Sequence, residues 1–226
     1  MLSREEIIQY GKIATQNGLS LAIHAIGDKA NREVIDAYSA IRQYEQDHLL
    51  PGLNHRIEHV QVLAEQDLYR LAENNIIASM QPIHLVSDMD TADRFWGKRS
   101  RYAYAFNSLL KNGTKLIFGS DSPVESFNPF SGMYAALTRA KFDQPHSGGW
   151  YPEEKILLDN ILSAYTINPA VISDWDDKIG SISAGKFADL IVLPLNPFEI
   201  DPNELKDLLP VATMVAGQWV WQEDEL

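Results

Sequence analysis

Three residues of metal-binding type each lie at or just after the end of a short segment that reads as a buried strand. His24 follows residues 19–23, His59 ends residues 55–59, and Asp121 comes just after residues 115–119. Imidazole and carboxylate groups are ligands of zinc and related divalent ions. Such an ion lowers the pKa of bound water from 15.7 to about 7, so that hydroxide can attack a polarised amide-type carbonyl. A carboxylate such as Asp121 can then carry the water proton to the leaving nitrogen.

Each of these residues also has an ordinary structural explanation. A single histidine at a strand end is more often hydrogen-bonded structure than a ligand, and an aspartate before Ser-Pro commonly caps a turn. However, the spacings of 35 residues between the two histidines and 62 from His59 to Asp121 equal one and about two βα units. The residues alone therefore leave metal binding and a structural role about equally supported.

The elements that must position these residues alternate along the chain. Ser3 and Glu6 have capping-box spacing, which predicts a helix from about residue 4 to 17 that ends at Gly18. Short buried strands are expected at residues 19–24, 55–59, 76–80 and 115–119. Helices are expected after Asp28, which can cap the first of them, and at about 65–75, before 113, near 132–141 and at 153–165.

Strand and helix in alternation are typical of parallel βα units, of which four precede about residue 170. Short strands at 180–182, 189–193, 211–215 and 218–221 then follow, separated by Gly and Pro turns. The sequence thus predicts an α/β domain over residues 1–175 and a small all-β segment over residues 176–226. In a parallel sheet, the loops after the strand carboxyl ends form the functional face.

Composition narrows the classes of partner. The 226 residues are 45% hydrophobic, which is enough for a core, and carry a net charge of −12, which argues against binding to a nucleic-acid backbone. The absence of cysteine excludes disulfides and thiolate metal sites. No apolar window of membrane-spanning length occurs and the first residues lack the apolar core of a signal peptide, so we expect a cytoplasmic protein that does not enter the membrane.

An ordered set of motifs carries a resemblance to a known family. The motifs are HAIGD (24–28), RIEH (56–59), ASMQP with a histidine (78–84), GSDSPVE (119–125), GGWYPEE (148–154), AYT (164–166), GSI (180–182) and AGKFADL (184–190). Together they resemble the YtcJ-like branch of the amidohydrolase superfamily, the amidohydrolase family 3 group. The resemblance covers almost the whole chain.

The resemblance implies the C-terminal half of a TIM-like (β/α)8 barrel, joined to part of a β-sandwich. It implies that His24 and His59 are the metal histidines after the fifth and sixth barrel strands. Asp121 would be the aspartate after the eighth strand, which contacts the metal and shuttles the proton. The cofactor would be a divalent metal, most often zinc, with one or two ions in the complete site. Asp189 would be structural.

Further residues have less specific expectations. Gln81, His84 and Trp150 are candidates for contact with a small amide-type substrate, although packing roles are about as well supported. Structural or surface roles are expected for Arg56, Glu58, His55, His48 and His146. Asp28 could also support His24 from the second coordination sphere.

The sequence departs from the family pattern in one respect. The family has a His-x-His pair after the first barrel strand and a bridging Lys or acidic residue near the fourth, and no His-x-His occurs here. Three explanations compete: a fragment of a longer hydrolase of carbon–nitrogen bonds other than peptide bonds, a chain that pairs with a separate N-terminal half, or a non-catalytic remnant that self-associates or binds partners. We favour the first.

Overall fold

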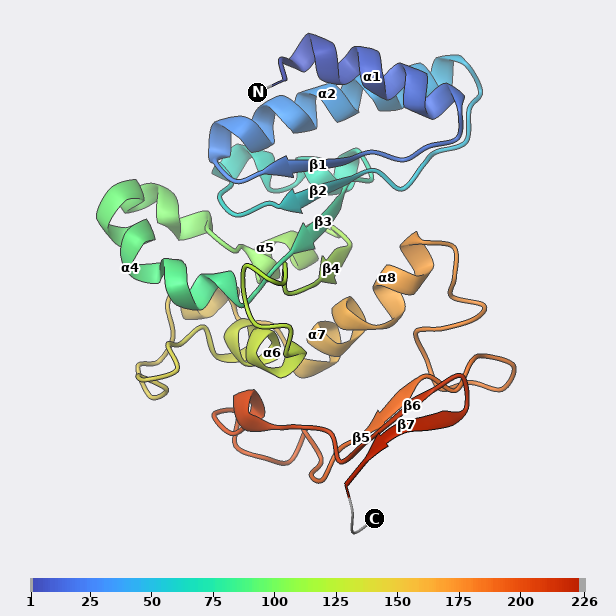
Figure 1. Cartoon of the computed structure of the whole chain (residues 1–226). Helices are drawn as coiled ribbons and strands as arrows, with labels where there is room; N and C mark the ends of the chain where they lie inside the picture. The colour runs from blue at the N-terminus through green and yellow to red at the C-terminus, as the bar shows by residue number, and fades with distance from the viewer. Residues whose placement is uncertain (1, 224–226) are drawn as a thin grey trace. The chain divides into compact units, whose positions relative to one another are not determined.

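The chain begins with a helix whose start is fixed by side chains. In the computed structural model, which describes residues 2–223, α1 spans Arg4–Gln16 (Figure 1). The Ser3 hydroxyl accepts a hydrogen bond from the Glu6 amide at 3.2 Å, and the Glu6 carboxylate accepts one from the Ser3 amide at 2.7 Å. The predicted capping box is therefore confirmed, and the helix ends before Gly18, whose φ is +71°.

A four-stranded sheet in the order β1-β2-β3-β4 follows. Its strands are β1 (Ala22–Ala25), β2 (Arg56–His59), β3 (Ile77–Met80) and β4 (Leu116–Phe118). The β1–β2 and β2–β3 pairs are parallel, with Ala25 opposite His59. The four predicted strands and the α/β class are confirmed, although each strand is shorter than expected.

The helix α2 (Asp28–Asp47) packs against α1, and both lie beside β1 in Figure 1. Its buried face includes Val34, Tyr38 and Ile41, the apolar positions expected from helical spacing. The N-cap residue is Gly27, so the prediction that Asp28 caps this helix is wrong by one position. Asp28 lies in the first turn instead, where the positive end of the helix dipole stabilises its carboxylate. The carboxylate also forms an ion pair with Arg99 at 3.2 Å.

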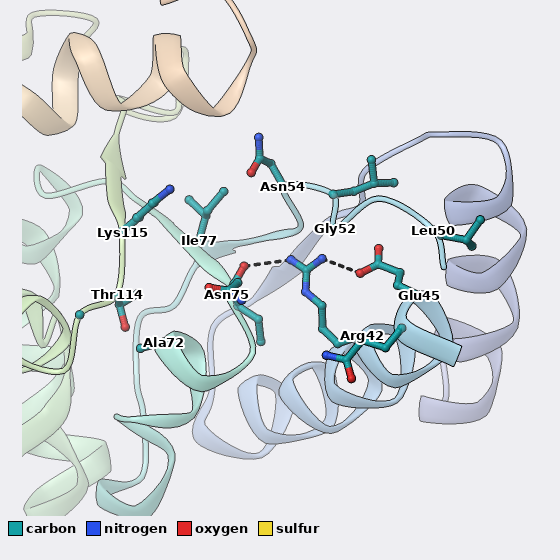
Figure 2. A pocket seen from close by; sticks show the side chains of 14 residues that line it. Arg42, Glu45, Leu50, Gly52, Asn54, Ala72, Asn75, Ile77, Thr114 and Lys115 are labelled. Carbon is teal, nitrogen blue, oxygen red and sulfur yellow. Dashed lines mark hydrogen bonds and ion pairs between the residues drawn. The ribbon is translucent and has the colours of Figure 1, made fainter. Parts of the chain in front are cut away.

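His55 connects α2 to the starts of two strands. Its Nδ1 accepts a hydrogen bond from the Leu21 amide at 3.0 Å, so its Nε2 carries the proton and donates it to the Glu45 carboxylate, also at 3.0 Å. Glu45 in turn accepts a hydrogen bond from Arg42 at 2.7 Å (Figure 2). Burial of the imidazole lowers the pKa of His55. His55 is therefore structural, as predicted.

The single helix predicted over residues 65–75 is wrong. The structure has a 3-10 turn at Glu65–Asp67 and one helical turn, α3, at Arg70–Glu73. Asp67 is buried and accepts hydrogen bonds from Arg32 and Arg70 at 2.8 and 3.0 Å. Arg32 lies 35 residues before Asp67 in the sequence, so this ion pair is tertiary, and it favours two short helical turns over the continuous helix that local propensity would allow.

The remaining helices are mostly where the sequence placed them. They are α4 (His84–Trp96) with a 3-10 segment at Gly97–Tyr102, α5 (Phe106–Lys111), α6 (Pro129–Thr138), a 3-10 turn at Pro152–Glu154, α7 (Leu158–Tyr165) and α8 (Ile167–Ile172). The helix predicted at 153–165 is divided into a 3-10 turn and α7.

The C-terminal strands form an antiparallel sheet in the order β5-β6-β7. They are β5 (Leu190–Val192), β6 (Ala212–Val215) and β7 (Gln218–Gln222), with a 3-10 turn at Leu205–Asp207 between β5 and β6. The strand predicted at 180–182 is wrong: Gly180 has a φ of +86°, and a Cβ there would lie 2.7 Å from the Ala170 Cβ. That segment is a turn packed on α8. Asp189 is structural as expected, since it accepts a hydrogen bond from the Ala216 amide at 2.7 Å.

The chain divides into two compact units. The first comprises Met1–Gln81 and Ser87–Ile117, and the second comprises Pro82–Val86 and Phe118–Leu226. The first core includes Ile35, Ile57 and Leu71, and the second includes Tyr134 and Ile161. Within residues 2–223, no helix combines the length and apolar character needed to span a bilayer.

Candidate metal centre

The parallel sheet brings two predicted ligands together within the first unit. His24 is the third residue of β1 and His59 is the last residue of β2. Their ring centroids are 4.4 Å apart, with the ring planes at 74° to one another. Two imidazoles at the carboxyl ends of adjacent parallel strands can provide nitrogen ligands to one ion.

The backbone beyond β2 is strained. His59 and Val60 have φ values of +75° and +45°, in the left-handed region that non-glycine residues avoid. The cost is largest for Val60, which is β-branched and fully buried. Conformations of this kind concentrate at functional sites, where the surrounding packing holds them.

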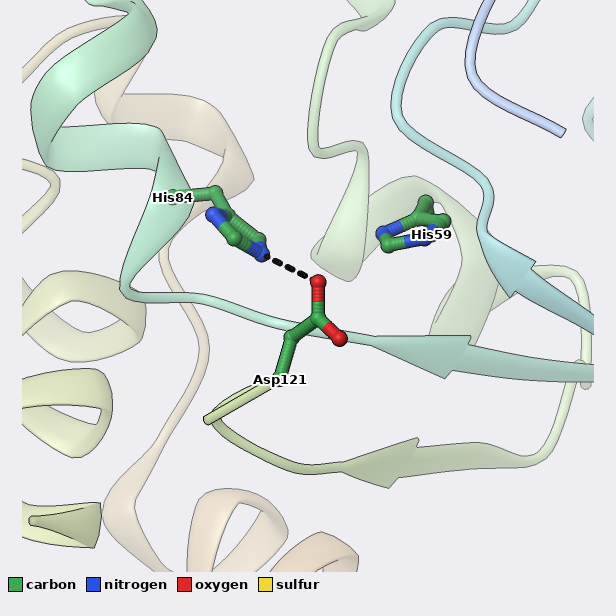
Figure 3. A group of neighbouring side chains, drawn as sticks. All are labelled: His59, His84 and Asp121. Carbon is green, nitrogen blue, oxygen red and sulfur yellow. Dashed lines mark ion pairs between the residues drawn. The ribbon is translucent and has the colours of Figure 1, made fainter. Parts of the chain in front are cut away.

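The second unit provides a histidine and two carboxylates. His84 begins α4, and its Nε2 lies 3.5 Å from the Asp121 carboxylate (Figure 3). The other ring nitrogen, Nδ1, lies 3.9 Å from the Glu125 carboxylate. Asp121 comes three residues after β4 and has a φ of +58°. The structure therefore brings His84 and Asp121 together, as it does His24 and His59.

His84 is expected from the sequence to contact the substrate, and that role stays a prediction. The structure adds that His84 lies beside Asp121, the predicted proton shuttle. His59, His84 and Asp121 are all of the residue types that bind divalent ions. The signal was present in the sequence, because His84 comes four residues after β3, much as Asp121 comes three residues after β4.

Gln81 directly follows β3 in the first unit and is 7% exposed. Its side-chain carbonyl oxygen has no hydrogen-bond partner within residues 2–223. A buried unpaired acceptor is costly, so this atom is available to a donor from a ligand or from water. This observation is compatible with the predicted substrate contact.

Trp150 is held in the second unit by two hydrogen bonds with Arg139, which we call the Arg139–Trp150 clasp. The Trp150 amide donates to the Arg139 carbonyl at 2.6 Å, and Nε of Arg139 donates to the Trp150 carbonyl at 2.7 Å. The Arg139 guanidinium also lies 5.5 Å from the centre of the indole ring, within cation–π range. Arg139 is fully buried, so the clasp fixes both ends of the loop at residues 140–149 and thereby positions the half-buried Trp150.

The residues expected to be structural have partners of their own. Arg56 and Glu58 pair at 2.6 Å on one face of β2, as the alternation of a strand predicts. His48 is exposed and contacts the Tyr44 carbonyl at 2.9 Å, and His146 is exposed. The carboxylate of Asp28 engages Arg99 and the amide of Lys29.

The donors suit a divalent metal. The side chains of His84 and Asp121 are 14% and 41% exposed, so solvent and substrate can reach them. Within the described residues no Lys or Arg forms an ion pair with Asp121, so its charge remains available to a cation. Since the chain has no thiolate, imidazole and carboxylate are the ligand types present.

Comparison with known proteins agrees with this chemistry. The model of the amidohydrolase family matches residues 1–221. Protein LONG AFTER FAR-RED 3 of Arabidopsis thaliana is 33% identical over 98% of the chain and 37% of its own length. The putative amidohydrolase YtcJ of Bacillus subtilis is 30% identical over 93% of the chain and 39% of its own length. The N-substituted formamide deformylase of Arthrobacter pascens is 30% identical over 95% of the chain and 39% of its own length.

Solved structures show the same relationship. An uncharacterized metal-dependent hydrolase of Pyrococcus horikoshii superposes with a TM-score of 0.74 at 29% identity, covering 89% of this chain and 39% of that one. Its counterpart from Pyrococcus furiosus gives a TM-score of 0.68 at 28% identity, covering 82% and 36%. The chain thus spans well under half the length of these proteins. It belongs to the amidohydrolase family.

Proposed function

We propose that this chain forms part of a metal-dependent hydrolase that acts on carbon–nitrogen bonds other than peptide bonds. The observation that carries the proposal is the pairing of metal-type side chains after strands of the parallel sheet: His24 with His59, and His84 with Asp121. The name of one relative, an N-substituted formamide deformylase, supports amide-type substrates. We also propose that the four-stranded sheet is the second half of a (β/α)8 barrel.

In this proposal His24, His59 and Asp121 hold the divalent ion, with zinc as the first candidate because two of the three ligands are imidazoles. When bound, the ion supplies a water whose pKa is lowered to about 7 and polarises the substrate carbonyl. Gln81 and Trp150 contact the substrate.

Asp121 has the proton-transfer role. Its carboxylate accepts the proton of the attacking water and delivers it to the leaving nitrogen, which is a poor leaving group while unprotonated. His84, 3.5 Å from Asp121, orients this carboxylate between the two transfers. His84 thus has a positioning role in addition to the substrate contact expected from the sequence.

The test uses the longest gene product that contains this sequence, because the relatives are longer than the chain. Metal content by mass spectrometry and hydrolysis of a panel of N-substituted formamides and amides are measured together. We expect bound zinc or a related ion and turnover of at least one formamide. Absence of bound metal together with no turnover across the panel would contradict the proposal.

A further inference from the structure

A second concave region lies at the opposite ends of the strands in the first unit. Its cavity of about 330 Å³ is bounded by the C-terminal half of α2, residues 50–54, and the starts of β3 and β4 (Figure 2). The residues that precede parallel strands lie on the face opposite their carboxyl ends. This cavity is therefore separate from His24 and His59, and nothing in the proposed hydrolysis uses it.

The walls offer hydrogen-bond donors that the protein leaves available. The Lys115 side chain is exposed, extends in Figure 2 from the start of β4 toward Ile77 and Asn54, and forms no ion pair within residues 2–223. An unneutralised ammonium favours a ligand that is anionic and accepts hydrogen bonds.

The carboxylate of Glu45, which lines the cavity, is already occupied by hydrogen bonds within the protein. Glu45 accepts hydrogen bonds from His55 at one oxygen and from Arg42 at the other. Arg42 also donates to the carbonyls of Asn74 and Asn75, at 2.8 and 3.0 Å, so it is held rigidly at the cavity. A guanidinium has five N–H groups, and these three bonds leave others for a ligand. The charged groups that remain available to a ligand are thus the cationic ones, Arg42 and Lys115.

Leu50, Leu53, Ile76 and Ile77 contribute aliphatic surface to the lining, beside the polar Gln46, Asn54 and Asn75. We propose that this cavity binds a small organic anion, in which a carboxylate or phosphate contacts Lys115 and Arg42 and a short aliphatic body packs on the aliphatic side chains. The net charge of −12 disfavours non-specific attraction of anions, so binding depends on the local donors.

Gly52 offers a way to close the cavity without strain. Its φ is outside the left-handed region, and a Cβ there would have the Arg42 Nη1, at 4.0 Å, as its nearest neighbour. Gly52→Leu therefore extends a side chain toward Arg42 into open space. Lys115→Met removes the ammonium and keeps the aliphatic stem, and Lys111→Met, on α5 outside the cavity, is the matched control.

The experiment measures calorimetric binding of butyrate, butyl phosphate and uncharged butyramide to the purified chain and its variants. We expect saturable binding of at least one of the two anions, little or no binding of butyramide, and an affinity at least about tenfold weaker in G52L and K115M but unchanged in K111M. Preference between the two anions distinguishes a carboxylate ligand from a phosphate ligand. Absence of saturable binding by both anions, or equal affinities in the wild type, G52L and K115M, would overturn the proposal.

Discussion

Asp121 is the single residue on which the proposed proton transfer depends. Asp121→Asn keeps the size of the side chain but removes its basicity, and general acid–base groups typically contribute about 10²–10⁴-fold to a rate. We expect kcat to fall by this amount, measured on a formamide that the wild type hydrolyses. Metal content is measured in parallel, because Asp121 is also a proposed ligand. Asp143 is an exposed acid of the same unit, and Asp143→Asn should leave kcat and metal content unchanged. Equal activity of D121N and the wild type would exclude the proton-shuttle role of Asp121.

His55 makes the stability of the first unit depend on pH. Burial lowers its pKa in the folded protein, so below about pH 6.5 the unfolded chain binds a proton that the folded chain does not. The contribution of His55 to the free energy of unfolding is therefore complete above this pH and decreases as the pH falls below it. Urea unfolding of the wild type and of the His55→Gln variant is measured at several pH values. Of these two proteins, only the wild type should show this decrease in the free energy of unfolding as the pH falls. The exposed His48→Gln variant should keep this dependence of the free energy of unfolding on pH. Loss of the dependence in the His48→Gln variant would show that His55 is not the group responsible.

At the scale of elements, Gly11 sets the approach of α1 to α2. Alanine has the higher helix propensity, by about 1 kcal/mol. However, a Cβ at residue 11 would lie 2.8 Å from Cγ1 of Ile41, whose side chain is fully buried and is therefore confined by its other neighbours. Overpacking typically costs about 1–3 kcal/mol, so the clash outweighs the propensity gain. We expect Gly11→Ala to lower the melting temperature. Ala14→Gly, in the same helix, isolates the propensity effect, and an increase in melting temperature for G11A would show that the helices can separate without cost.

The clasp between Arg139 and Trp150 holds the loop at residues 140–149 closed. Arg139→Lys keeps the charge but replaces the guanidinium, whose Nε donates to the Trp150 carbonyl, by a single ammonium. We expect faster cleavage by proteinase K within residues 140–149, detected by mass spectrometry of the first fragments. The exposed Arg94→Lys variant should be cleaved at the wild-type rate. Unchanged cleavage of R139K would mean that the backbone bond alone closes the loop.

At the scale of the whole molecule, the outer strand of the C-terminal sheet leaves aromatic surface uncovered. All five residues of β7 are exposed, and Trp219 and Trp221, which flank an irregularity in the pairing with β6, are each 46% exposed. Sheet edges with apolar side chains and no charged residue favour association. We expect the chain to form a dimer or larger assembly by light scattering, and Trp221→Lys to weaken it. Trp175→Lys makes the same change at a residue that is 52% exposed outside this sheet, and should not alter the mass. A monomer for the wild type would contradict this expectation.

Local patterns in the sequence were enough to predict α1, the four strands of the parallel sheet, β5 to β7 and the family. Apolar runs, a capping box and ordered motifs act over a few residues, so they can be recognised without knowledge of distant contacts. The failures at residues 65–75 and 180–182 have tertiary causes. At the first, Asp67 is held by Arg32, which is distant in sequence; at the second, Gly180 packs closely on Ala170.

The candidate site shows the same division. The sequence by itself determined that His24, His59 and Asp121 follow strands and that Gln81, His84 and Trp150 stand nearby in the motifs. Only the tertiary structure decided that the His24 ring meets the His59 ring and that His84 faces Asp121. These partners are tens of residues apart, and their distance depends on sheet register and loop path, which sequence periodicity does not encode. The cavity lined by Thr114 and Lys115 likewise exists only because three strand starts and one helix end converge.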